Sequence, residues 1–170
     1  LVDFNDMILN FIKANASPNF DVVFVDEAQD LSLMQWDMVK TIWNRTTDNY
    51  IAGDDDQAIF KWAGADVDSF IALDGKFINL TQSYRIPAKI HEVAMKIIGK
   101  INNRIPKLWK PKMKQGKVSV YADFRDIDMS QGEWLILART RSLLDELEEV
   151  LYQKGYYYKN KFKKGYESEL

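Results

Sequence analysis

The sequence has 170 residues, of which 46% are hydrophobic and 28% charged, as is typical of a globular protein with one domain or two small ones. The net charge of −2 gives the whole chain no attraction for nucleic acid, although a local basic groove is compatible with it. The absence of cysteine excludes disulfides and thiolate metal sites, and no apolar run approaches the ~20 residues that span a membrane.

Short apolar runs along the chain predict β-strands. In chain order these runs are 22–25, 50–52, 77–80, 118–121 and 134–138. They hardly alternate with polar residues, which favours strands covered on both faces of a parallel sheet.

Helical patterns lie between these runs. Ser32 and Gln35 have the spacing of a capping box, which predicts a helix with an apolar stripe through residues 33–43. Pro87 suits the first turn of a second helix. The apolar face of that helix would consist of Ile90, Val93, Ala94, Ile97 and Ile101. A third helix is predicted over 143–151, with Gly155 as its stop. Alternating strands and helices predict an α/β fold with parallel sheets.

Residues 105–117 interrupt this alternation. They contain two prolines, one glycine and five lysines, which is typical of a connecting segment. We expect a solvated loop here, with phosphate contact by its lysines as the alternative.

The strand predicted over 22–25 ends in two adjacent acids, Asp26 and Glu27. An acid at the tip of a buried strand can hold Mg²⁺, which prefers one or two carboxylates together with phosphate oxygens and water. A second acid beside it can accept a proton from an attacking water. The alternative is that both acids cap a strand-to-helix turn in solvent.

The next strand leads into G-D-D-D-Q-A-I-F-K-W-A-G-A over residues 53–65. Gln57 is neutral and can orient a water or a phosphate oxygen without a charge conflict. Phe60 and Trp62 can stack nucleic-acid bases if the loop is exposed, at ~1–3 kcal/mol per base, or can belong to the core.

Arg85 follows the predicted strand over 77–80 and directly precedes the helix that Pro87 begins. An arginine at such a position can stabilise a transferring phosphoryl group. A surface salt bridge is the alternative.

Taken together, these motifs resemble those of superfamily 1 DNA helicases of the UvrD/Rep/PcrA type. Residues 22–30, V-V-F-V-D-E-A-Q-D, look like motif II, and residues 53–65 look like motif III. Q-S-Y-R over 82–85 looks like motif IV. The resemblance implies α/β, parallel-sheet, RecA-like lobes of a P-loop NTPase. Residues 1–80 would form the C-terminal part of the first lobe (1A), and residues 81–170 the N-terminal part of the second lobe (2A).

The resemblance also implies roles at the nucleotide, with ATP and Mg²⁺ as cofactors. Asp26 and Glu27 would be the metal site, and Glu27 would activate water as the catalytic base. Gln29 and Gln57 would sense or contact the γ-phosphate. Arg85 would reach the same phosphate from the second lobe.

On the DNA side, Phe60 and Trp62 match the motif III aromatics that contact single-stranded DNA. Ala63 stands where the family usually has Arg, so the resemblance implies either a weaker DNA contact or one that shifts to Lys61 on the same loop. Single-stranded DNA, duplex junctions and ATP are therefore the expected partners, in the cytoplasm of a bacterial or phage-infected cell and with no membrane.

The phosphate-binding motif G-x-x-x-x-G-K-[ST] does not occur in the 170 residues. One hypothesis is that the chain is an internal portion of an ATP-dependent helicase and is inactive by itself. The alternative is a non-catalytic helicase-like module that binds single-stranded DNA or a protein partner. A helicase–nuclease fusion is a third possibility.

Overall fold

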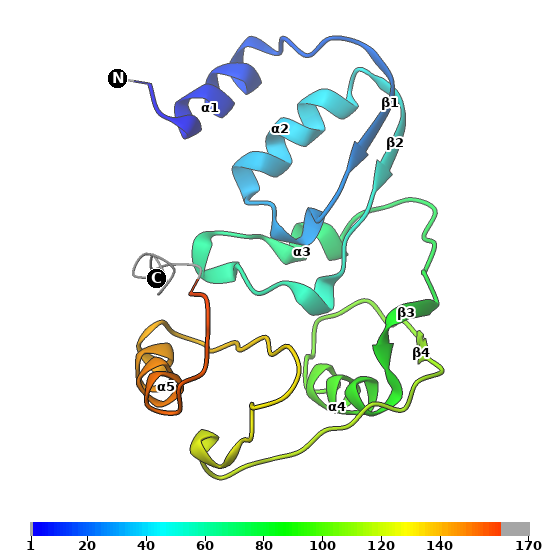
Figure 1. The fold of residues 1–170 in the computed structure, drawn as a ribbon. Helices are drawn as coiled ribbons and strands as arrows, with labels where there is room; N and C mark the ends of the chain where they lie inside the picture. Colours follow the sequence, from blue (N-terminus) through cyan, green and yellow to red (C-terminus); the bar gives the residue numbers. More distant parts are fainter. Residues whose placement is uncertain (1, 161–170) are drawn as a thin grey trace. The chain divides into compact units, whose positions relative to one another are not determined.

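The computed structural model describes residues 2–160 and divides the chain into two compact units, Leu1–Lys117 and Val118–Leu170 (Figure 1). The first unit contains α1 (Phe4–Ala14), β1 (Phe20–Val25), α2 (Leu33–Trp43), β2 (Thr46–Ile51), α3 (Val67–Ile71), β3 (Gln82–Pro87), α4 (Ala88–Ile98) and β4 (Lys110–Lys112). The second contains α5 (Ser142–Gln153). Within residues 2–160, every helix is too short or too polar to cross a membrane.

Helices α1 and α2 both begin with a reciprocal cap. The Asp3 side chain accepts the Asp6 N–H, and the Asp6 side chain accepts the Asp3 N–H. Ser32 and Gln35 repeat this arrangement at the start of α2. The capping box predicted at Ser32 is confirmed, whereas α1 has no counterpart among the predicted helices.

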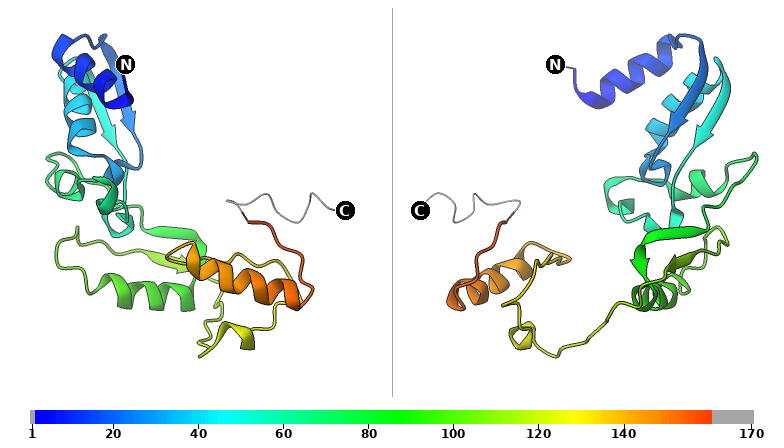
Figure 2. Two further views of the ribbon diagram at one scale, coloured as in Figure 1. Left: turned by 90° about the vertical axis from the view of Figure 1, so that its left-hand side faces the viewer. Right: turned by 45° about the vertical axis from the view of Figure 1, so that its right-hand side comes forward.

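Strands β1 and β2 form a parallel pair, and α2 connects them along one face of the pair (Figures 1 and 2). The pairing runs from Phe20 opposite Thr46 to Val25 opposite Ile51. The buried core of this unit lies between α2 and the strand ends and consists of Ala28, Trp36, Val39 and Phe70. Parallel strands joined by a helix confirm the predicted α/β class.

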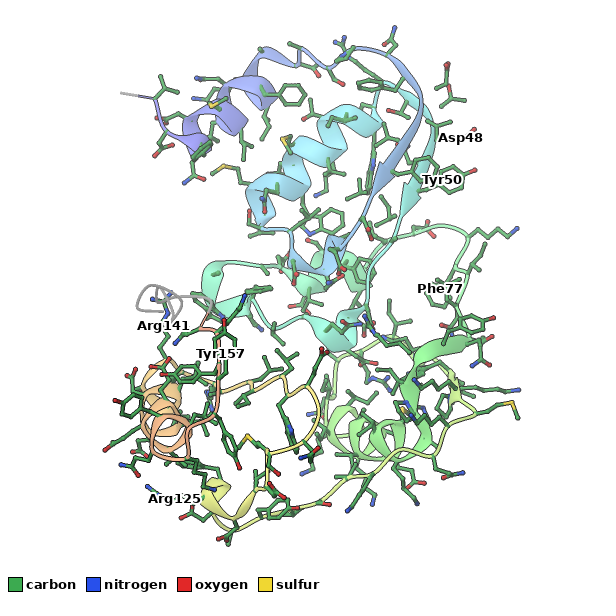
Figure 3. All side chains as sticks on the ribbon, viewed as in Figure 1. Asp48, Tyr50, Phe77, Arg125, Arg141 and Tyr157 are labelled. Carbon is green, nitrogen blue, oxygen red and sulfur yellow. The ribbon has the colours of Figure 1, made fainter. Side chains whose placement is uncertain are left out.

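The face of this strand pair opposite α2 is open among the described residues. Phe24 is 75% exposed and Tyr50 54% exposed, and their rings stack at 5.0 Å. Figure 3 shows Tyr50 on the side of β2 away from α2. The expectation that these strands are covered on both faces is therefore wrong for residues 2–160. The non-alternating apolar run leaves its outward side chains to stack on one another.

A second parallel pair, β3 and β4, carries α4. Gln82 lies opposite Lys110 and Pro87 opposite Lys112, with an irregularity between them. The N–H groups of Ala88 and Lys89, at the start of α4, donate to the carbonyls of Lys114 and Gln115 at 3.0 and 2.8 Å. The helix predicted after Pro87 is confirmed. Part of the predicted loop 105–117 is instead a strand, and another part caps a helix.

Three predicted strands, over 77–80, 118–121 and 134–138, have no strand pairing in the structure. Leu80 is 86% exposed, Val120 95% and Leu135 85%. A short apolar run becomes a strand only where a neighbouring strand supplies hydrogen bonds, and these runs have no such neighbour within residues 2–160.

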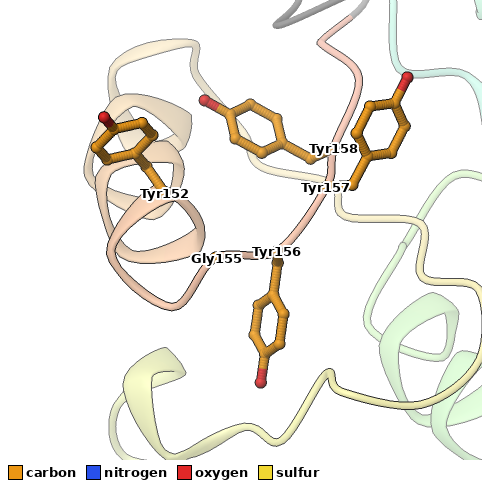
Figure 4. Close-up of a pocket in the computed structure, with 5 residues that line it drawn as sticks. All are labelled: Tyr152, Gly155, Tyr156, Tyr157 and Tyr158. Atoms are coloured by element: carbon orange, nitrogen blue, oxygen red, sulfur yellow. The ribbon is translucent and has the colours of Figure 1, made fainter. Parts of the chain in front are cut away.

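The second unit is built on α5, whose buried side chains are Leu147, Val150 and Leu151. Gly155 follows the helix with φ +69°, and Tyr156 N–H donates to Leu151 O at 2.9 Å. The predicted stop at Gly155 is confirmed, because glycine takes this left-handed conformation without strain. Just beyond it, a hollow of about 250 Å³ is lined by Tyr152, Gly155, Tyr156, Tyr157 and Tyr158 (Figure 4).

Candidate nucleotide site and its flanking loop

Asp26 and Glu27 lie at the carboxyl end of β1, and both are exposed. Glu27 has left-handed backbone angles (φ 51°, ψ 39°), which are uncommon for a residue other than glycine. Asp26 Oδ1 accepts the Glu27 N–H at 2.9 Å and supports this turn. Such strain in a non-glycine residue is a reason to examine a position for function.

Gln29 connects this turn to the end of the neighbouring strand. The residue is 1% exposed. Its Nε2 donates to Glu27 Oε2 at 2.7 Å, and its Oε1 accepts the Asp54 N–H at 2.9 Å. One buried amide therefore fixes the Glu27 carboxylate and the first residue after Gly53.

Gly53 is required by this arrangement. A Cβ at this position would lie 2.7 Å from Gln29 Oε1 and 2.9 Å from the ring of Phe70. Such distances are below van der Waals contact, so a larger residue would displace the Gln29 amide or the core aromatic.

The connection continues through the loop after β2 to Gln57. Residues Asp55–Gln57 form a 3₁₀ turn that the Asp54 side chain caps. Gln57 Nε2 donates to Asp54 Oδ2 at 2.5 Å, and Gln57 is exposed. A continuous series of polar contacts therefore runs from Glu27 through Gln29 and Asp54 to Gln57.

Two cations from the chain after β3 pair with the acids of this loop. Arg104 contacts both carboxylate oxygens of Asp56, with Nε at 2.7 Å and a terminal nitrogen at 2.6 Å. Lys107 Nζ lies 2.9 Å from Asp54 and 3.1 Å from Asp56, and it also donates to Asp55. The expectation of a solvated loop is wrong for Lys107, whose side chain is only 11% exposed.

Burial disfavours the charged forms in this cluster, and the ion pairs outweigh it. Burial raises the pKa of Asp56, but hydrogen bonds from Arg104 and Lys107 bring it below the ordinary value of 3.8. Burial likewise opposes the Lys107 ammonium, but its three carboxylate partners hold the pKa of Lys107 above the ordinary 10.5. Both shifts favour the charged forms of Asp56 and Lys107.

Phe60, Lys61 and Trp62 follow Gln57 on the same loop. Trp62 is 83% exposed and Phe60 42%, and their ring centroids are 6.4 Å apart. The alternative that these rings belong to the core is therefore wrong for Trp62. Lys61 is exposed between them.

The end of the loop that bears Phe60 and Trp62 is hydrogen-bonded to the segment after Gln29. A bridge joins Ser32 and Ala65, and the Asp66 N–H donates to Leu31 O at 2.8 Å. The exposed rings are therefore presented from a loop that is anchored at both ends.

Arg85 lies on β3 and is exposed. No ion pair or hydrogen bond joins its guanidinium to the other predicted site residues in the part of the chain that the structure describes. The structure thus brings Asp26, Glu27, Gln29 and Gln57 together and leaves Arg85 apart. The salt bridge considered as the alternative for Arg85 is likewise not formed within residues 2–160.

The oxygen atoms at the end of β1 fit the chemistry of Mg²⁺. The adjacent residues Asp26 and Glu27 each bear a carboxylate, and no lysine or arginine pairs with either within residues 2–160. Mg²⁺ is bound by one or two carboxylates, with phosphate oxygens and water as further ligands. Within these same residues, no group of three or more acidic or histidine side chains is arranged to hold a metal without such help.

Sequence reasoning missed Asp54, Arg104 and Lys107. Three consecutive aspartates at the end of a strand were a usable signal, since buried carboxylates require cations. The sequence does not indicate which cations, because Arg104 lies 48 residues from Asp56 and Lys107 lies 52 residues from Asp55.

Comparison with known proteins agrees with this geometry. Residues 1–78 match the UvrD/REP helicase N-terminal domain family, and their parallel strands are those of a RecA-like lobe. The predicted resemblance to UvrD-like superfamily 1 helicases is therefore confirmed.

Individual relatives extend the similarity along most of the chain. The chain is 28% identical to the ATP-dependent DNA helicase PcrA of Bacillus subtilis, over 92% of this chain and 26% of the relative. It is 28% identical to DNA helicase II of Escherichia coli, over 94% of this chain and 26% of the relative. DNA helicase II of Haemophilus influenzae is 30% identical over 75% of this chain. The chain thus spans about a quarter of the length of the first two relatives.

Proposed function

We propose that this chain is a portion of an ATP-dependent DNA helicase that couples ATP hydrolysis to movement along single-stranded DNA and to duplex unwinding. The observation that carries the proposal is the buried Gln29 amide. It joins the Glu27 carboxylate to the loop that bears both Gln57 and the exposed aromatics. A catalytic carboxylate and a DNA-facing loop are thereby parts of one hydrogen-bonded structure.

Glu27 is the catalytic base in this proposal. Its carboxylate takes a proton from water as the water oxygen bonds to the γ-phosphorus of ATP. The bond from that phosphorus to the β–γ bridging oxygen breaks, and ADP and phosphate result. The hydrogen bond from Gln29 occupies Oε2 and fixes the carboxylate's orientation, which leaves Oε1 for the proton.

Asp26 and Glu27 would hold Mg²⁺, which, when bound, neutralises negative charge on the phosphate oxygens. Gln57 would orient the attacking water or a γ-phosphate oxygen through its exposed amide. Arg85, from the second lobe, would stabilise charge on the same phosphate. The boundary between the lobes, near residue 80, stays a prediction.

Phe60, Lys61 and Trp62 would form the contact with single-stranded DNA. The rings offer stacking faces, and the lysine between them offers a charge for the phosphate backbone. A shift of Gln57 on nucleotide binding or release would reach these side chains within five residues of the same loop. This short path would couple the nucleotide state to the grip on DNA.

The missing phosphate-binding motif favours a second candidate. Because G-x-x-x-x-G-K-[ST] does not occur in the 170 residues, the isolated chain is expected to lack measurable ATPase activity. A module that binds single-stranded DNA or a protein partner without catalysis would also have this property. The predicted location in a bacterial or phage-infected cell is compatible with either candidate.

The deciding experiment is a DNA-stimulated ATPase assay of the complete natural protein that carries this chain, beside the isolated 170-residue chain. The proposal expects single-stranded DNA to raise the rate of the complete protein and the isolated chain to remain inactive. A complete protein without ATPase activity that still binds single-stranded DNA would instead support the second candidate.

A further inference from the structure

Charge is distributed unevenly along the first unit. Residues 1–80 contain 14 acidic and five basic side chains, whereas residues 81–117 contain ten basic side chains and one acidic side chain, Glu92. The two segments are therefore electrostatically complementary. Oppositely charged segments of one chain attract each other. The attraction is strongest where their side chains meet in a buried site, because the dielectric constant is lower there than in water.

The two segments meet at one buried cluster. The Asp55 side chain is 2% exposed and that of Asp56 is 6% exposed. The side chains of Lys107 and Arg104 are 11% and 18% exposed. Ile105 N–H adds a backbone contact to Asp55 Oδ2 at 2.8 Å. Removal of one partner from such a cluster leaves a buried charge without compensation, so its members hold one another in place.

The cluster lies directly beside the proposed catalytic loop. Asp54 accepts from Lys107 through Oδ1 and from Gln57 through Oδ2. Asp54 also donates its N–H to Gln29. The position of Lys107 therefore affects the Gln57 amide through the Asp54 side chain. It affects the Glu27 carboxylate through the Asp54 backbone N–H and the Gln29 side chain.

We propose that Arg104 and Lys107 are positioning residues of the proposed ATPase. They clamp the turn over residues 54–57. The clamp thereby fixes the positions of Gln57 and of the exposed rings of Phe60 and Trp62 relative to Glu27. The inference rests on the proposed function for its catalytic consequence. The clamp itself rests only on the contacts described above. If the predicted lobe boundary near residue 80 is right, the clamp also joins the two lobes, because its acids precede the boundary and its cations follow it.

The test compares three variants of the complete natural protein. Lys107→Met removes the charge and keeps much of the side-chain length, whereas Lys107→Arg keeps the charge. Lys114→Met is the matched control, because Lys114 is an exposed lysine of the same segment outside the cluster. Amide hydrogen exchange, which requires no ATPase activity, is read for Gln57, Ala58 and Ile105.

Lys107→Met should speed exchange of these amides by about tenfold or more, because their turn loses its buried partner. Lys107→Arg and Lys114→Met should stay within about threefold of the natural protein. In the ATPase assay, Lys107→Met should lower the DNA-stimulated kcat by about tenfold while the KM for ATP changes little, as expected of misplaced catalytic groups. Lys107→Arg should restore most of that loss.

Arg104→Lys keeps the inference testable if Lys107→Met does not fold, since it retains the charge but gives up the two-pronged contact with Asp56. It should speed exchange of Gln57 and Ala58 by more than the roughly threefold margin allowed for the two control variants. Unchanged exchange in the folded variants overturns the clamp, and faster exchange with an unchanged kcat overturns the positioning role. A natural protein without ATPase activity overturns the proposed function and the positioning role with it, while exchange still decides whether the clamp exists.

Discussion

Two acidic groups lie at the ends of neighbouring parallel strands, and they differ in exposure and in ion pairing. Asp26 and Glu27 after β1 are exposed, and among the described residues their carboxylates accept hydrogen bonds from the Glu27 N–H and from the Gln29 amide. The aspartates over 54–56 after β2 meet Arg104 and Lys107, and the second and third are almost fully buried. The first group has no cation of its own within residues 2–160, and the second has two.

This difference distinguishes the acids of the proposed site, Asp26 and Glu27, from the aspartates over 54–56, which stabilise a neighbouring loop. Carboxylates that the fold has already neutralised gain little from an external cation, and they stabilise the loop they belong to. Carboxylates oriented by a neutral amide keep their charge available for Mg²⁺ or a proton. The strained backbone of Glu27 fits this interpretation, because a conformation maintained at a cost requires surroundings that hold it in place.

Glu27→Gln in the complete natural protein is the strongest test of the difference between the two acidic groups. Removing the base should lower the ATPase rate by roughly 10²–10⁴-fold, while nucleotide binding and thermal stability remain close to those of the natural protein. Steady-state ATPase assays and nucleotide titration measure the two effects. Normal turnover in this variant would contradict the role of Glu27 and with it the distinction between the two acidic groups.

Features that depend on neighbours in the sequence were predictable. The capping box of Ser32 and Gln35 and the stop at Gly155 each involve residues within one helical turn or a single backbone angle. The predicted site residues Glu27, Gln29 and Gln57 also come together, since they follow adjacent parallel strands whose carboxyl ends share one edge.

Features that depend on distant partners were not predictable. The run over 77–80 has the composition of a strand but no pairing partner, and the strand of this region begins at Gln82. Lys107 looked like one of several loop lysines, and only the fold brings it to Asp55. A sequence pattern gives the preference of each segment, whereas burial and pairing depend on which segments meet.

Trp62→Ala tests whether the loop held by the second acidic group faces DNA. Trp62 is 83% exposed, so its loss should leave stability unchanged and weaken single-stranded DNA binding by about 1–3 kcal/mol, the value of one stacked base. DNA titration by fluorescence anisotropy measures the affinity, and the DNA-stimulated ATPase rate should fall more than the basal rate. An equal fall in both rates would indicate a structural role for Trp62.

Gly53→Ala tests the link between the two acidic groups. The added Cβ would lie 2.7 Å from Gln29 Oε1 and 2.9 Å from the Phe70 ring, so the variant should lose about 1–3 kcal/mol of stability. The displaced amide should also lower kcat more than it alters the KM for ATP. Gly75→Ala is a control for glycine replacement as such, because a Cβ at Gly75 meets nothing within 4 Å. Unlike Gly53, Gly75 has a positive φ of 142°, so any loss of stability in this control comes from its backbone and not from a contact of the Cβ.

The smallest expected effect is in the pH dependence of the second group. The pKa of Asp56 is lowered below 3.8 in the fold, so its contribution to stability is present above 3.8 and is lost as pH falls through the lower folded value. The pKa of Lys107 is raised above 10.5, so its contribution is present below 10.5 and is lost as pH rises beyond the raised value. Between these limits the contributions of Asp56 and Lys107 should be insensitive to pH. Asp56→Asn should therefore flatten the acid side of a plot of unfolding temperature against pH, whereas Asp48→Asn, at an exposed position of β2, should leave it unchanged.

An Asp56→Asn variant with the full acid dependence of the natural protein would show that the paired aspartates do not stabilise the loop. It would also remove the contrast with Asp26 and Glu27.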